Sequence, residues 1–123
     1  MLVQINTDHN IEGSESLTAQ VRGVVENELI RFSHHITRVE VHLSDENSDK
    51  KGGNHDMRCL IEARLEGRKP IVVTHQATTL DQSVGGAVNK LNKLIKSTLD
   101  RLHDENRKRT DPPPPGTELT EEL

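Results

Sequence analysis

"TRVEVHLS", residues 37–44, alternates apolar and polar side chains without a break. Successive residues of a strand point to opposite faces of a sheet, so this stretch predicts a strand with one dry and one wet side. The dry side carries Val39, Val41 and Leu43, and the wet side carries Arg38, Glu40 and His42. The fold must therefore cover one face of a sheet and leave the other face in water.

Three further segments around this strand also favour extended structure. Residues 2–7 predict a short strand, with Leu2 or Val3 and Ile5 on its buried side. Residues 56–67 alternate again, and residues 70–77 follow after a tight turn, which predicts a hairpin. The dry positions of strand 56–67 are Met57, Cys59, Ile61, Ala63 and Leu65. These segments complete a sheet of four strands.

Two amphipathic helices are available to cover the dry face. The first runs from a cap at Ser14 or Ser16 to about Phe32, and the second runs from a cap at Thr79 to about residue 105. The first inward stripe is Leu17, Val21, Val24, Val25, Leu29 and Phe32, and the second is Leu80, Val84, Ala87, Val88, Leu91, Ile95, Leu99 and Leu102. The order β-α-β-β-β-α predicts an α+β two-layer sandwich with both helices packed on one face of a four-stranded sheet.

Composition limits the classes of protein to consider. The chain has 123 residues, 31% of them hydrophobic, and one aromatic residue, Phe32, so the core is small and aliphatic. We expect one domain over residues 1–106 and a disordered tail over 107–123, basic at first and then rich in proline and acids. No segment resembles a signal peptide or a membrane span. The single cysteine, Cys59, fits a reducing cytoplasm.

Charge is distributed unevenly along the chain. The formal net charge is −4. Residues 1–49 hold 3 basic and 9 acidic residues, whereas residues 50–109 hold 13 basic and 7 acidic residues. Residues 110–123 hold 4 acids and no base. Because salt screens each field within about 10 Å, the basic second half can attract phosphate in spite of the overall negative charge.

A lysine ridge on the second helix is the main candidate binding surface. Lys90, Lys93 and Lys96 lie roughly opposite the apolar stripe, and Asn89 and Gly86 extend the same side. One interpretation is an ordinary solvated helix face. The other is a ridge that binds nucleic-acid phosphates with a strong dependence on salt. The pair Gly85–Gly86 either permits close packing or leaves a smooth patch for a partner.

Patterns for metal binding or catalysis are weak. Asp45, Asn47 and Asp49 have the first ligand spacings of a calcium loop, but Lys50 replaces the required glycine and Asp56 replaces the final glutamate. The seven histidines and Cys59 lack zinc-ligand spacing. We find no phosphate-binding glycine loop, nucleophile elbow or catalytic carboxylate pair. We therefore expect that the protein is not an enzyme and that it uses no cofactor, no metal and no small-molecule substrate.

The arrangement resembles the ribosome hibernation-promoting factors, also called sigma-54 modulation or ribosomal subunit interface proteins. The resemblance covers roughly residues 1–105 and rests on the element order, "VQINTDHN" (3–10), "HITRVEVHLS" (35–44) and "TLDQSVGGAVNKLNKLIKS" (79–97). Within the last stretch, Asn89-Lys90-Leu91 matches a family motif that usually reads Asp-Lys-Leu. The first helix departs from the pattern, because Gln20, Gly23, Glu26 and Asn27 stand where the family usually has basic residues.

This resemblance implies a cytoplasmic, non-enzymatic protein that lodges in the channel for messenger and transfer RNA and shuts down translation in starved or resting cells. The implied partner is the small ribosomal subunit with its 16S rRNA; no membrane is implied, and a weak homo-oligomer stays open. The expected rRNA-binding residues are Lys90, Lys93, Lys96, Arg58, Arg64 and Arg101. Two alternatives remain. One is a protein-interaction module that engages a basic partner through the acidic first helix or tail, and the other is a domain that binds a small ligand between sheet and helices.

Overall fold

The computed structural model describes residues 1–8, 11, 14–45 and 57–110, with side chains as far as Asp104. The predicted order of elements is confirmed. The elements are β1 (Leu2–Thr7), α1 (Glu15–Leu29), the 3-10 turn η1 (Ile30–Phe32), β2 (Ile36–Asp45), β3 (Met57–Leu65), β4 (Ile71–Ala77) and α2 (Leu80–Thr110).

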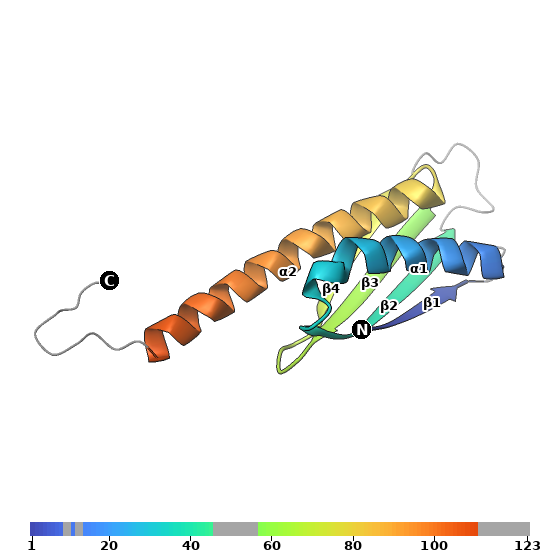
Figure 1. The fold of residues 1–123 in the computed structure, drawn as a ribbon. Helices are drawn as coiled ribbons and strands as arrows, with labels where there is room; N and C mark the ends of the chain where they lie inside the picture. Colours follow the sequence, from blue (N-terminus) through green and yellow to red (C-terminus); the bar gives the residue numbers. More distant parts are fainter. Residues whose placement is uncertain (9–10, 12–13, 46–56, 111–123) are drawn as a thin grey trace, which may run out of the picture.

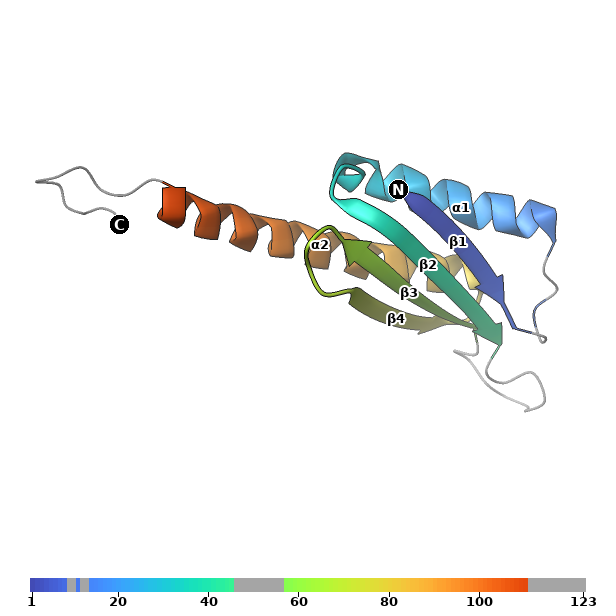
Figure 2. The same ribbon diagram turned by 90° about the horizontal axis from the view of Figure 1, so that it is seen from below.

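The four strands form one sheet in the order β1-β2-β3-β4. β1 runs parallel to β2, because α1 carries the chain back between them, and the other neighbours are antiparallel. Both helices lie on the same face of the sheet, as Figures 1 and 2 show from two directions. α2 lies against β3 and β4, whereas α1 lies against β1. The predicted α+β two-layer sandwich is therefore confirmed.

The core lies between the sheet and the helices and is aliphatic, as predicted. Val39, Val41 and Leu43 of β2 are buried, and so are Cys59, Ile61, Ala63 and Leu65 of β3. In β1, Val3 is buried, whereas Leu2 is 62% exposed. Burial raises the pKa of the Cys59 thiol to about 12. Cys59 is therefore a protonated core residue at neutral pH, in agreement with the sequence interpretation.

Ser14 caps the N-terminus of α1, because its hydroxyl accepts a hydrogen bond from the Leu17 backbone N–H at 3.0 Å. Its buried positions are Val21, Val25 and Leu29. Val24 was expected on the inward stripe but is 39% exposed. A helix turns by about 100° per residue, so Val24 falls on the flank of the line that the other three define. α1 thus rests on the sheet along a narrower stripe than predicted.

Thr79 caps the N-terminus of α2, because its hydroxyl accepts a hydrogen bond from the Gln82 backbone N–H at 3.1 Å. Its buried side chains are Ser83, Val84, Ala87, Val88, Leu91 and Ile95. The helix continues to Thr110 instead of ending near residue 105, and its last turns extend past the sheet (Figure 1). No helix in the described part of the chain is both long and apolar enough to cross a membrane.

The two glycines of α2 have different surroundings. A Cβ atom at Gly85 would meet no neighbouring atom within 4 Å, whereas a Cβ at Gly86 would overlap the imidazole ring of His75. Gly86 therefore permits close contact between α2 and β4. Gly86 lies one turn before Lys90, which also contacts β4, so it shares the side of Lys90 as predicted, but the His75 ring covers it and the position is not open.

Two sequence predictions fall partly or wholly outside the described residues. The calcium-like loop is described only at Asp45, since residues 46–56 lie outside. The tail over residues 111–123 also lies outside. The division into a domain over 1–106 and a tail over 107–123 stays a prediction, although α2 continues through residue 106.

Candidate nucleic-acid interface

Three lysines project from α2, but their ammonium groups have different surroundings. All three side chains are exposed, and all three lie in the part of α2 whose buried side chains pack on the sheet. The Nζ atom of Lys90 donates a hydrogen bond to the backbone carbonyl of Thr74 at 2.9 Å. Because Thr74 lies in the edge strand β4, Lys90 is directed toward the sheet edge while it keeps its full charge.

Lys96 is paired with an acid. Its Nζ atom lies 2.9 Å from Oδ2 of Asp100, one helical turn further along α2. Asp100 therefore neutralises much of the field of Lys96, although an exposed pair of this kind contributes little to stability. Lys93 and Arg101 are exposed and have no hydrogen bond or ion pair with any described side chain. Lys93 and Arg101 are thus the least constrained cations of the predicted set on α2.

The two predicted arginines of β3 lie on the other side of the molecule. Arg58 and Arg64 alternate with the buried positions Cys59 and Ala63, so they lie on the face of the sheet that the helices leave open. Arg64 lies 3.5 Å from a carboxylate oxygen of Glu62. Arg58 is half-buried beside a hollow that is also lined by His42, Asn6 and Leu60.

Acidic residues balance much of the open face. An Nη atom of Arg38 lies 2.7 Å from Glu40, and the same side chain donates to Oε1 of Gln4 at 2.8 Å. His42 approaches the other carboxylate oxygen of Glu40 at 3.4 Å. The structure therefore divides the six predicted residues between two opposite sides. Lys90, Lys93, Lys96 and Arg101 share the helix side, and Arg58 and Arg64 share the sheet side with Glu40 and Glu62.

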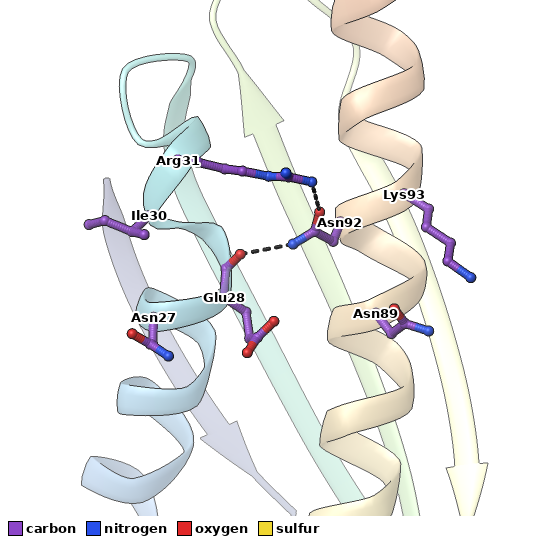
Figure 3. A pocket seen from close by; sticks show the side chains of 7 residues that line it. All are labelled: Asn27, Glu28, Ile30, Arg31, Asn89, Asn92 and Lys93. Carbon is purple, nitrogen blue, oxygen red and sulfur yellow. Dashed lines mark hydrogen bonds between the residues drawn. The ribbon is translucent and has the colours of Figure 1, made fainter.

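A contact between the two helices was not predicted. The Asn92 side chain accepts a hydrogen bond from Nη2 of Arg31 at 2.7 Å and donates one to the backbone carbonyl of Glu28 at 2.8 Å (Figure 3). The guanidinium of Arg31 also lies 4.6 Å from the centroid of the Phe32 ring. Arg31 and Asn92 are 61 positions apart in the chain, so no local sequence signal could identify this contact.

The residues of this contact line a shallow surface groove between α1 and α2, with a volume of about 500 Å³. Figure 3 shows Asn92 pointing toward α1, whereas Asn89 and Lys93 point away from it. The residues that line the groove are Asn27, Glu28, Ile30, Arg31, Asn89, Asn92 and Lys93. Lys93, a predicted site residue, and Arg31 of η1 are thus both among the lining residues, but the Lys93 side chain points away from Arg31.

Metal binding has no support among the residues that the structure describes. In that part of the chain, no group of three or more His, Cys, Asp or Glu side chains is placed to hold a metal ion. The space between the layers is occupied by fully buried aliphatic side chains, including Val25, Val39, Ile61 and Leu91. The chemistry that the described surface offers is therefore hydrogen bonding and charge.

Comparison with known proteins adds information on the family and the fold. Residues 4–103 match the family model described as sigma 54 modulation protein / S30EA ribosomal protein. No curated protein matches the chain. Two solved structures are similar in fold. The N-terminal domain of Protein Y from Thermus thermophilus has 22% sequence identity and a TM-score of 0.58, with 80% of this chain and 99% of that chain covered.

The second similar structure is a ribosomal subunit interface protein from Coxiella burnetii, at 14% identity and a TM-score of 0.61. The similarity covers 81% of this chain and 99% of that chain. At these identities the two structures establish the fold alone. The family match over residues 4–103 covers most of the sequence, from β1 to His103 in α2. The chain therefore belongs to the sigma 54 modulation protein / S30EA ribosomal protein family, a family of ribosome-associated, non-enzymatic factors.

Proposed function

We propose that this protein binds 16S rRNA of the small ribosomal subunit in the channel for messenger and transfer RNA, and that it thereby holds cytoplasmic ribosomes inactive in starved or resting cells. Membership of a ribosome-associated family supports this proposal. The observation that carries it is the charge on the helix side, where Lys90, Lys93 and Arg101 are exposed and have no carboxylate partner among the described residues.

Backbone phosphates are the ligands that suit this surface best. Lysine and arginine bind phosphate through charge without reading the sequence of bases. Aromatic side chains on which bases could stack are scarce, since the chain has a single phenylalanine and it is buried in the core. Binding should therefore depend on the shape and charge of folded rRNA, and it should weaken steeply as salt increases.

Co-sedimentation with purified small subunits over a series of salt concentrations tests the proposal. We expect log K to fall with log salt by roughly 0.7–0.9 for each phosphate contacted. The double variant Lys90→Glu, Lys93→Glu should abolish binding at salt concentrations where the wild type still sediments with the subunits. Arg68→Glu, Lys69→Glu is the matched control, because it changes the net charge equally at two exposed positions of the β3–β4 turn.

Two results would contradict the proposal. One is a wild type that fails to sediment with subunits at low salt, and the other is binding that the Lys90 and Lys93 reversals leave unchanged. If the wild type does not bind ribosomes but does bind a basic protein, the interaction module is favoured instead. The exposed acids of α1, Glu15, Glu26 and Glu28, would then form its contact surface.

A further inference from the structure

We infer that Lys90 keeps the protein from self-associating through the open edge of β4, because its ammonium group occupies the central carbonyl of that edge and places a positive charge there. The partner that Lys90 excludes is β4 of a second copy, which would pair with this strand antiparallel about a two-fold axis. This inference goes beyond the proposed function, since it gives Lys90 a role in the free protein, with no ribosome present.

Charged side chains lie in the inner strands of the sheet and not in its edge strands. β1 and β4 form the two edges (Figure 2). Neither contains Lys, Arg, Asp or Glu, whereas β2 and β3 contain Arg38, Glu40, Asp45, Arg58, Glu62 and Arg64. Natural proteins commonly protect an exposed edge with charged side chains, especially lysine, in the edge strand itself. β1 and β4 lack this protection.

The sequence of β4 suits pairing with another strand. "IVVTHQA" (71–77) is rich in β-branched residues and contains neither proline nor glycine. Val72 is 54% exposed, so the strand also presents an apolar side chain to solvent. A strand of this kind at an open edge is a site of self-association unless some other part of the molecule protects it.

The backbone groups of Thr74 point away from the rest of the sheet. Along a strand in an antiparallel sheet, the backbone N–H and C=O of successive residues point alternately to the two sides. The N–H of Glu66, directly after β3, donates to the carbonyl of His35, directly before β2, at 3.0 Å, so the even-numbered residues of β3 point toward β2. Leu60 is one of these residues and lies opposite Thr74. Thr74 therefore directs its N–H and C=O to the open edge of β4.

Lys90 binds this edge at its midpoint. Its Nζ atom donates to the Thr74 carbonyl at 2.9 Å, and Thr74 is the fourth of the seven residues of β4. In an antiparallel pair of two β4 strands centred on Thr74, that carbonyl would be needed as an acceptor for the other copy. Lys90 already occupies it, and the Lys90 ammonium groups of the two copies would repel each other across the axis.

The opposite edge of the sheet has the same arrangement. The N–H of Asp8, directly after β1, donates to the Leu43 carbonyl of β2, so the even-numbered residues of β1 point toward β2 and Val3 points outward. Nη2 of Arg22, which lies in α1, donates to the Val3 carbonyl at 3.4 Å. Each edge strand thus has an outward carbonyl bound by a cation of the helix that packs against that strand. Two occurrences on separate elements support a protective role for these contacts.

Sedimentation-velocity ultracentrifugation of the full chain, without ribosomes and over a range of protein concentrations, tests the inference. Lys90→Ala should form dimers at least tenfold more tightly than the wild type, because it frees the Thr74 carbonyl and removes the repelling charge. Lys93→Ala is the matched control, since it removes the same charge from an exposed position of the same helix that has no bond to a described side chain. This control should sediment like the wild type.

A second substitution locates the association. Thr74→Pro removes an N–H that points to the open edge, where proline is tolerated in a strand. In the Lys90→Ala background it should return the sedimentation coefficient to that of the wild type. Thermal melts show whether each variant is folded. If Thr74→Pro unfolds, Val72→Lys replaces it in the same background, because it restores the lost charge on the edge strand itself.

Two results overturn the inference. One is a Lys90→Ala variant that self-associates no more tightly than Lys93→Ala. The other is self-association of Lys90→Ala that persists when Thr74→Pro, or Val72→Lys in its place, is added to a folded protein. Because no ribosome is present in the experiment, neither result bears on the proposed function.

Discussion

Gly86 and Gly85 are neighbours in α2, yet a methyl group should have opposite effects at the two positions. Gly85→Ala should stabilise the fold by up to about 1 kcal/mol, because alanine favours the helix and nothing lies within 4 Å of the added carbon. Gly86→Ala should destabilise it by about 1–3 kcal/mol, because the added carbon overlaps the His75 ring. Urea denaturation of both variants measures the difference.

Removing the obstacle provides the control for this prediction. With His75→Ala in the background, Gly86→Ala should lose most of its penalty, because the ring that it meets is gone. Equal effects of the two glycine substitutions, or a penalty at Gly86 that persists without the His75 ring, would contradict the close contact. The sequence showed the pair of glycines but left two interpretations open, since only the position of β4 decides between them.

Individual cations illustrate the same limit of prediction. The helical period correctly placed Lys93 and Arg101 on an exposed side of α2. It could not show that Lys90 reaches the Thr74 carbonyl, because that contact depends on where β4 lies. Arg31 was not among the predicted site residues. Its hydrogen bond to Asn92 joins parts of the chain that are 61 positions apart, so it follows from the fold and not from a local pattern.

At the scale of elements, the start of α1 makes a sharp prediction. The sequence offered Ser14 or Ser16 as the cap, and the structure selects Ser14 through its bond to the Leu17 N–H. Ser14→Ala should therefore cost about 0.5–2 kcal/mol of stability. Ser16→Ala should be neutral or slightly stabilising, because Ser16 is an exposed residue within the helix. Thermal or urea denaturation would contradict the assignment if Ser16→Ala were the more costly change.

Elements with strong periodicity were the most predictable from sequence. β2 alternates from Arg38 to Leu43 and β3 from Arg58 to Leu65, and the buried residues of these stretches agree with the predicted dry face. α2 was less predictable at its C-terminal end, because the last turns have no sheet beneath them and the apolar pattern stops at Leu102. The parallel pairing of β1 with β2 had no signal of its own and followed only from the intervening helix.

The whole molecule has a helix side and a sheet side, and they should differ in their contribution to RNA binding. The pair Lys93→Gln, Arg101→Gln removes two unpaired charges from the helix side. The pair Arg58→Gln, Arg64→Gln removes the same charge from the sheet side, where Glu62 lies beside Arg64. We expect the first pair to weaken subunit binding at least tenfold more than the second.

Sedimentation with small subunits at a fixed, moderate salt concentration measures this difference. A larger loss from the Arg58 and Arg64 pair would place the interface on the open sheet face instead. The sequence predicted both sets of residues as one site. Because strand alternation sends Arg58 and Arg64 away from the helices, only three-dimensional assembly could separate the two sets.

Because the Cys59 side chain is buried, the natural chain is convenient for site-directed labelling. Maleimides react with thiolates, and the buried thiol, with its pKa raised to about 12, offers almost none at neutral pH. A cysteine introduced at an exposed position of either helix would therefore be the one reactive thiol, and Cys59 would not have to be replaced first. Fluorophores or photocrosslinkers could then report which nucleotides lie next to each helix without disturbing the core.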